Sequence, residues 1–157
     1  MEEKYMQEAL KEAQKAFEKE EVPIGAVIVK EGKIIARAHN LRETKKMATS
    51  HAEILAIEKA CKKMNAWRLE DCDMYVTVEP CFMCAGAIIN ARIKNLYIGT
   101  MDPKAGAAGS KLNLFQDIKL NHTVNVFYKV REKECQTILQ DFFQKLRQGE
   151  KYQKNRK

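Results

Sequence analysis

Residues 80–84 read Pro80-Cys81-Phe82-Met83-Cys84, and His51-Ala52-Glu53 lie upstream of them. A Cys-x-x-Cys stretch can hold one metal ion from a single turn of backbone, and a distant histidine can add a third ligand. Zinc usually takes four ligands in a tetrahedron, and a catalytic zinc keeps one position for water. His51, Cys81 and Cys84 therefore predict a zinc site with one open position. Glu53 follows His51 closely enough to reach that water without binding metal, so we expect it to be the catalytic residue.

Each half of this pattern has an ordinary explanation when it is taken alone. A Cys-x-x-Cys pair in an intracellular protein can be a redox pair or part of a zinc knuckle. Ser50 and Glu53 also fit a capping box at the start of a helix. The combination favours the metal site, because Glu79 and Pro80 directly precede the first cysteine and His51 opens a helix-like run.

The composition predicts one domain with a substantial core. The chain has 157 residues, of which 45% are hydrophobic and 31% are charged. No apolar run approaches the roughly 20 residues of a membrane span, and the N-terminus does not resemble a secretory signal. The five cysteines, an odd number, favour free thiols in a reducing cytoplasm. We expect Cys61, Cys72 and Cys135 to be small buried apolar residues.

The net charge of +7 is concentrated near the C-terminus. After Gln144, one acid, Glu150, faces six basic residues: Lys145, Arg147, Lys151, Lys154, Arg156 and Lys157. Such a segment suits a polyanionic partner such as nucleic acid. A solvated, frayed C-terminus explains the same charge equally well. We therefore expect a single domain over residues 1–157 with a basic tail over about residues 149–157.

Hydrophobic periodicity and turn residues predict alternating helices and strands. The expected helices span residues 3–19, 50–64, 81–91 and 132–148, with a short helical turn at 112–116. The expected strands span residues 22–29, 34–38, 73–78, 96–99 and 124–128, and polar loops fill 41–49 and 101–110. This order predicts a three-layer α/β/α fold around a five-stranded mixed sheet, with the later strands parallel.

The same order predicts where a site would form. Ligands of such sheets bind beyond the carboxyl ends of strands, near helix N-termini. His51 and Cys81 both stand at predicted helix starts that follow strands. Two such helices side by side would bring His51, Cys81 and Cys84 together, and their dipoles would stabilise the thiolates.

Nearly the whole chain resembles the zinc-dependent deaminase superfamily, and within it the bacterial tRNA-specific adenosine deaminases. The superfamily signature is His-x-Glu followed by Pro-Cys-x-x-Cys. The tRNA branch is indicated by Trp67-Arg68-Leu69, by the loop Gly106-Ala107-Ala108-Gly109-Ser110 and by Phe142-Phe143 in the last helix. Three residues depart from the usual pattern: Ala48 and Ser50, in the loop entering the pocket, and Gln144, where a lysine or arginine that contacts phosphate is usual.

The resemblance implies a cytidine deaminase-like fold, one zinc ion per chain and a cytoplasmic homodimer. It implies hydrolytic deamination of adenosine to inosine at the wobble position of a tRNA anticodon stem-loop, with Glu53 moving the protons. Asn40 and the Ala52 backbone would contact the flipped base. Four further residues match positions near the anticodon loop: Asp102, Lys104, Phe143 and Arg147.

Ordinary roles stay open for several of these residues. Asn40 could simply end a strand, and Lys104 could be a solvated loop lysine. Of Phe142 and Phe143, we expect one in the core and one exposed. His39 and His122 are expected to be hydrogen-bonded structural residues.

Two other functions also stay open. A deaminase of a free purine base or nucleoside, such as guanine, would share the zinc ligands and Glu53 but would not need the basic tail. A catalytically silent RNA-binding or scaffolding subunit would hold a structural zinc. Glu53 and the missing fourth ligand argue against that second alternative.

Overall fold

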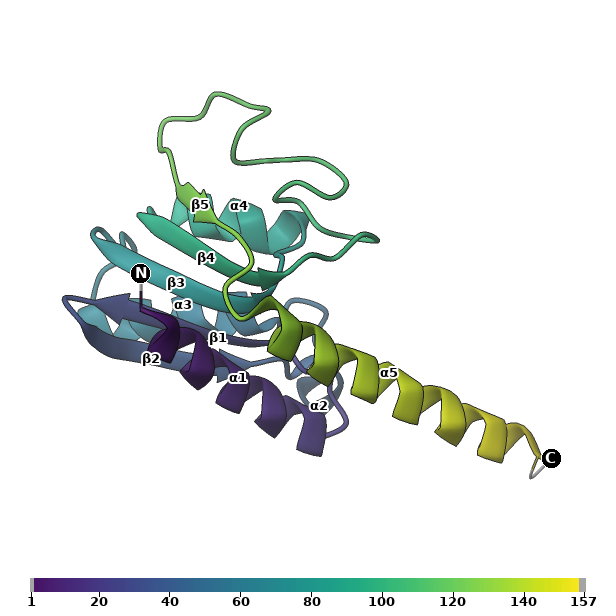
Figure 1. Ribbon diagram of the computed structural model, residues 1–157. Coiled ribbons are helices and arrows are strands. Elements are labelled where there is room, and N and C mark those ends of the chain that lie inside the picture. The colour runs from purple at the N-terminus through teal and green to yellow at the C-terminus, as the bar shows by residue number, and fades with distance from the viewer. Residues whose placement is uncertain (1, 156–157) are drawn as a thin grey trace.

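The computed structural model describes residues 2–155, with the side chains of residues 2–149. Five helices and five strands follow one another along the chain (Figure 1). In chain order they are α1 (Glu3–Glu18), β1 (Gly25–Lys30), β2 (Lys33–His39), α2 (Arg42–Lys45), α3 (Ala52–Met64), β3 (Cys72–Val78), α4 (Phe82–Asn90), β4 (Asn95–Thr100), β5 (Asn125–Phe127) and α5 (Glu132–Asn155).

The strands form one mixed sheet in the order β2-β1-β3-β4-β5. Strand β1 is antiparallel to both β2 and β3, whereas β3 and β4, and β4 and β5, are parallel. The β1–β2 hairpin turns at Glu31 and Gly32, whose φ angles of 50° and 76° suit a two-residue turn with both residues left-handed. The predicted five-stranded mixed sheet, with its later strands parallel, is confirmed.

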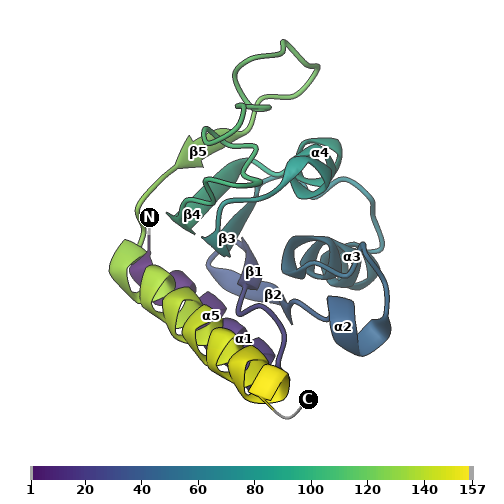
Figure 2. The same ribbon diagram turned by 90° about the vertical axis from the view of Figure 1, so that its right-hand side faces the viewer.

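Helices cover both faces of the sheet. Helices α1 and α5 lie side by side on one face, and α2, α3 and α4 lie on the other (Figure 2). Strand β3 shows why, since Met74 and Val76 are buried in the core with Ala56 of α3, while Tyr75 belongs to a second core with Met6 of α1. The alternation of apolar side chains along β3 therefore gives the sheet two buried faces.

Helix α1 packs very closely on β1. A Cβ atom at Gly25 would lie 1.9 Å from the carbonyl oxygen of Ala9, so only glycine fits at the start of β1. Glu12, on the inner side of α1, accepts hydrogen bonds from Lys15 and from His39 at the end of β2. His39 is thus a structural residue, as predicted.

The segment before α3 differs from the predicted one in two ways. His51, and not Ser50 or Thr49, is the N-cap of α3, and its side chain makes no capping hydrogen bond. The carbonyl of Ser50 instead accepts a hydrogen bond from the N–H of Leu41, which closes the loop and shifts the start of the helix. The predicted polar loop also contains the short helix α2.

Glu21 explains this extra helix. Its buried carboxylate accepts hydrogen bonds from the N–H of Glu43 at 3.1 Å and from the N–H and hydroxyl of Thr44 at 2.6 Å. These are the unpaired donors of the first turn of α2. The acceptor is distant in sequence, so local propensity could not predict the helix.

We expect Glu21→Gln to lower the free energy of unfolding by about 2 kcal/mol at pH 7, because the amide turns a donor toward these N–H groups. Burial raises the pKa of Glu21, but the hydrogen bonds from Thr44 and Glu43 outweigh burial and hold the pKa below 4.5. The contribution of the ionised carboxylate is therefore present above pH 4.5 and is lost as pH falls through the lowered native pKa.

Denaturant unfolding at pH 7 and in acid measures this effect. The stability of the wild-type protein should fall toward that of Glu21→Gln in acid, while Glu20→Gln, an exposed neighbour, should match the wild type throughout. A difference between Glu21→Gln and the wild type that does not change with pH would contradict the prediction.

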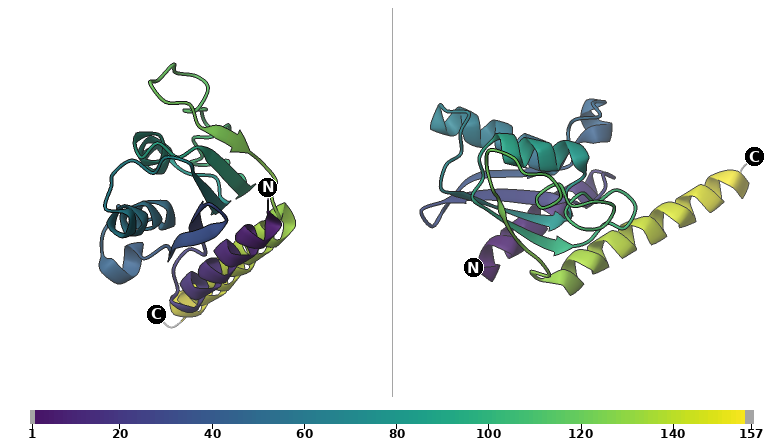
Figure 3. Two further views of the ribbon diagram at one scale, coloured as in Figure 1. Left: turned by 90° about the vertical axis from the view of Figure 1, so that its left-hand side faces the viewer. Right: turned by 90° about the horizontal axis from the view of Figure 1, so that it is seen from above.

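Helix α5 is longer than the sequence predicted, because it continues to Asn155 instead of ending at residue 148. Its C-terminal half extends beyond the sheet (Figures 1 and 3). The predicted apolar stripe is therefore buried only in part: Phe142 is buried, whereas Phe143 and Leu146 are exposed. The basic-tail side chains from residue 150 onward lie outside the described residues.

Among the remaining predictions, Cys72 and Cys135 are buried, but Cys61 is only half-buried near the end of α3. The expected turn at 112–116 is present as a turn rather than a helix. Within the described part of the chain, no helix combines the length and apolar character needed to cross a membrane.

Candidate metal centre and substrate groove

Three metal-binding side chains meet where α3 and α4 begin. His51 precedes α3, Cys81 precedes α4, and Cys84 lies in the first turn of α4. The Nδ1 atom of His51 lies 3.7 Å from Cys81 Sγ and 3.5 Å from Cys84 Sγ. In a tetrahedral zinc site a nitrogen and a sulfur ligand are about 3.6 Å apart. The structure thus brings together the three predicted ligands at distances that suit zinc.

The three side chains lie within hydrogen-bond distance of one another, so each perturbs the pKa of the others. The hydrogen bond from Cys84, together with one from His51, lowers the pKa of Cys81 to about 4. The same contact with Cys81 and burial raise the pKa of Cys84, and the contact with Cys81 raises the pKa of His51. Thiolate and imidazole are ligands that zinc prefers. Since a metal ion must displace the shared protons, its affinity should fall in acid.

Glu53 lies in the first turn of α3, beside the three ligands. Its side chain is buried, with 3% exposed, and its Oε1 atom has no hydrogen-bond partner among the described residues. Burial raises the pKa of Glu53 to about 7. A buried oxygen without a partner is unfavourable unless another molecule supplies a hydrogen bond. The site therefore fits a metal ion and the water molecule that the ion would supply, and a carboxyl with this pKa can both accept and donate a proton near neutral pH.

Asn40 and Ala52, the two predicted base contacts, bond to each other. The N–H of Ala52 donates to Oδ1 of the buried Asn40 at 2.8 Å. This bond fixes the orientation of the amide, so the NH₂ group of Asn40 is the end left to donate. Asn40 therefore does more than end a strand, because it joins β2 to the start of α3 beside His51.

The other four predicted substrate residues, Asp102, Lys104, Phe143 and Arg147, line one groove of about 730 Å³. Its walls come from the strand ends, from the loop after β4 and from α5. The backbone connects the groove to the metal ligands, because its wall residue Val78 leads through Glu79-Pro80 to Cys81. Its wall residue Ile24 accepts a hydrogen bond from the N–H of Asn40 at 3.1 Å.

The groove residues that were missed from the sequence include three on α5: Gln136, Leu139 and Gln140. Their helical spacing with Phe143 and Arg147 was a signal that could have found them. Phe143 is 40% exposed, and Phe142 is buried against Phe17 with ring centroids 5.8 Å apart. One phenylalanine in the core and one exposed is the predicted arrangement.

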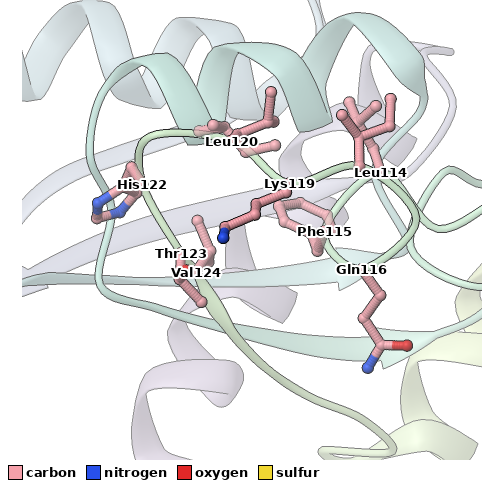
Figure 4. Close-up of a pocket in the computed structure, with 10 residues that line it drawn as sticks. Leu114, Phe115, Gln116, Lys119, Leu120, His122, Thr123 and Val124 are labelled. Carbon is pink, nitrogen blue, oxygen red and sulfur yellow. The ribbon is translucent and has the colours of Figure 1, made fainter.

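A second, smaller cavity of about 260 Å³ lies between α4 and the loop before β5 (Figure 4). Its lining includes Leu114, Phe115, Lys119 and His122, but none of the predicted site residues. His122 donates a hydrogen bond from Nε2 to the carbonyl of Ile93 at 2.7 Å, which supports its predicted structural role. The four predicted anticodon-loop residues thus belong to the larger groove and not to this cavity.

The α/β/α sheet, the His/Cys/Cys group at two helix starts and the buried glutamate together point to the class of the deaminases. The family described as MafB19-like deaminase matches residues 1–147. A tRNA-specific adenosine deaminase of Bacillus subtilis (strain 168) is 52% identical over 147 residues, which cover 94% of this chain and 91% of the relative. The chain belongs to the tRNA-specific adenosine deaminase family, and the resemblance seen in its sequence is confirmed.

Two solved structures extend the comparison. One comes from studies of A-to-I editing by tRNA:A34 deaminases at the wobble position of transfer RNA. It has a TM-score of 0.85 and 44% identity, and the match covers 88% of this chain and 100% of that one. The other is a guanine deaminase from Bacillus subtilis, with a TM-score of 0.63, 36% identity and coverage of 80% and 83%. The expected deaminase fold is confirmed, and the tRNA branch is the more similar of the two.

Proposed function

We propose that the protein is a hydrolase that converts adenosine to inosine at the wobble position of a tRNA anticodon loop. The observation that carries this proposal is the unpartnered carboxylate oxygen of Glu53 beside three ligands with zinc-like spacing. The 52% identity to a tRNA-specific adenosine deaminase supports the choice of adenosine in RNA.

His51, Cys81 and Cys84 would hold one zinc ion per chain. When bound, zinc supplies a water molecule that ionises near neutral pH. Glu53 takes a proton from the attacking water and passes it to N1 of adenine while C6 is attacked. Glu53 then takes the remaining proton of the former water from the hydroxyl on C6 and gives it to the departing amine, so that adenosine and water become inosine and ammonia. The raised pKa of Glu53 suits both proton transfers.

The substrate base must leave the stack of the loop to reach this centre. The free NH₂ group of Asn40 would donate to an acceptor on the ring of the flipped base. In the groove, Lys104 and Arg147 would meet phosphates and Phe143 would stack on a neighbouring base. Oδ1 of Asp102 accepts from the N–H groups of Lys104 and Ala105, which leaves Oδ2 for a ribose hydroxyl.

We further propose that the enzyme works as a cytoplasmic homodimer. Met47, in the segment before His51, and Phe82, directly after Cys81, are 54% and 52% exposed. Large apolar side chains beside a reaction centre are favourable places for a second subunit to pack. Light scattering of the purified protein should give twice the chain mass, and a monomeric mass would contradict this part of the proposal.

Incubation with total tRNA followed by sequencing for inosine tests the proposed reaction. Parallel incubation with free guanine, guanosine and adenosine, followed by mass analysis, tests the alternative. Inosine at one anticodon position without turnover of the free compounds supports the proposal. Turnover of guanine without inosine in tRNA would replace it with the free-purine alternative.

We expect Phe143→Ala to weaken binding of an anticodon stem-loop by about 1–3 kcal/mol, because stacking on a loop base is lost. Leu146→Ala is the matched control. Leu146 lies on the same helix and is 47% exposed, but it does not line the groove. Affinity measured by fluorescence anisotropy should fall for Phe143→Ala alone, with the melting temperature nearly unchanged in both variants. A large fall in melting temperature with normal affinity would instead make Phe143 a packing residue.

A further inference from the structure

Glu79 is a buried acid that neither the metal centre nor the groove uses directly. Its side chain is 3% exposed, and it immediately precedes Pro80-Cys81. Its oxygens accept hydrogen bonds from the N–H groups of Asp102 at 2.9 Å, Ala108 at 2.9 Å and Ser110 at 3.0 Å. They also accept one from the hydroxyl of Ser110. The carboxylate thus collects four donors from the single loop that follows β4.

That loop is fitted tightly over the carboxylate. A Cβ atom at Gly106 would lie 2.1 Å from the carboxyl carbon of Glu79, so no other residue fits there without displacing the loop or the acid. The N–H of Ala107 donates to the carbonyl of Pro80 at 2.9 Å, and the hydroxyl of Tyr128 donates to the carbonyl of Ala108 at 2.7 Å. The loop is therefore held against the segment that carries Cys81.

The arrangement is not an ordinary ion pair. Among the described residues, no lysine, arginine or histidine forms a salt bridge with Glu79. A buried carboxylate needs full hydrogen bonding in place of the water that it loses, and backbone N–H groups supply it here. Among the described residues, every hydrogen-bond donor to Glu79 comes from this loop, namely three backbone N–H groups and the Ser110 hydroxyl, so the acid and the loop geometry depend on each other.

The outer side of the same loop carries Asp102 and Lys104, which line the groove. One carboxylate thus connects the wall of the groove to the segment that supplies Cys81. We propose that Glu79 is a positioning residue, which fixes the Asp102–Ser110 loop so that RNA in the groove presents its base to the metal centre. This inference rests on the proposed function. It assigns Glu79 to substrate positioning and leaves proton transfer to Glu53.

Glu79→Gln tests the proposal. The amide keeps the size of the side chain, but its NH₂ group is a donor and cannot accept hydrogen bonds from the donors of the loop. We expect KM for an anticodon stem-loop to rise about tenfold, the effect of losing one hydrogen bond to a charged group. The single-turnover rate at saturating RNA should stay within about threefold of the wild-type rate, and elemental analysis should still find one zinc per chain. The amide hydrogens of Asp102, Ala108 and Ser110 should exchange faster with solvent.

Glu12→Gln is the matched control, because Glu12 is an equally buried acid on α1 that bonds to Lys15 and His39 and not to this loop. It should lower the melting temperature without changing KM or the exchange of the loop amides. If Glu79→Gln loses zinc, or if its rate at saturating RNA falls while KM stays normal, then Glu79 supports the metal centre and the proposal is wrong.

Ser110→Ala gives a second test if Glu79→Gln does not fold. It removes one donor and leaves the backbone bonds, so KM should rise a few-fold and exchange at Asp102 and Ala108 should quicken. Unchanged KM and unchanged exchange in Ser110→Ala would overturn the proposal. Failure of the proposed function would look different: the wild-type protein would then make no inosine in RNA, while amide exchange would still report whether Glu79 holds the loop.

Discussion

In the Glu53→Gln variant we expect one zinc ion per chain and a deamination rate lower by a factor of about 10²–10⁴, the usual contribution of a positioned acid or base. Glutamine keeps the shape of the side chain and can still bond to a water molecule, but it cannot carry the proton. The metal content should not change, because the ligand atoms of His51, Cys81 and Cys84 lie within 4.8 Å of one another and Glu53 is not one of the group. Elemental analysis and single-turnover assays on one preparation measure both quantities.

Glu58→Gln is the control for this prediction. Glu58 lies on the same helix, α3, but is exposed. The Glu58→Gln variant should therefore have the zinc content and the deamination rate of the wild type. Loss of zinc in Glu53→Gln would make Glu53 a ligand. Near-normal turnover would place the proton carrier elsewhere. If the wild-type protein binds RNA but never makes inosine, the result would favour the alternative of a catalytically silent RNA-binding subunit.

The metal centre could be predicted from the sequence because its geometry is mostly local. Cys81 and Cys84 are joined by one turn of backbone, and the fold must place His51 only at the start of a neighbouring helix. Strand–helix alternation already predicts that neighbouring helix starts meet at one end of the sheet. Glu53 follows from the same local spacing, but its burial and its raised pKa required the structure.

Features that depend on distant partners could not be predicted in this way. The short helix α2 forms because Glu21 caps it from another segment of the chain, and the loop after β4 takes its shape from Glu79. In the sequence, Glu21 looked like an ordinary charged residue, and Glu79 was notable only for its place before Pro80 and Cys81. The groove residues Gln136 and Gln140 were missed for another reason: polar side chains on an amphipathic helix are usually solvated, and only the tertiary structure shows which ones face a groove.

Cysteine substitutions give the second large expected effect. Cys84 and Cys72 are both fully buried, so removing either sulfur loses similar packing. Of these two cysteines, only Cys84 lies near other metal-binding atoms, with its Sγ 3.5 Å from His51 Nδ1. The Cys72 thiol instead bonds weakly to the carbonyl of Glu70. The pair therefore separates a role in metal binding from a role in packing.

We expect Cys84→Ala to lose zinc and deamination together, whereas Cys72→Ala keeps both and loses only some stability. Removing a group that merely orients a ligand weakens metal binding by about 10–100-fold, so removing a ligand should weaken it further. With His51 and Cys81 alone, the protein should therefore lose its metal during dialysis against a chelator that leaves the wild type loaded. Full zinc occupancy in Cys84→Ala after that dialysis would refute the three-ligand site. Loss of zinc in Cys72→Ala as well would mean that the centre responds to any loss of core packing.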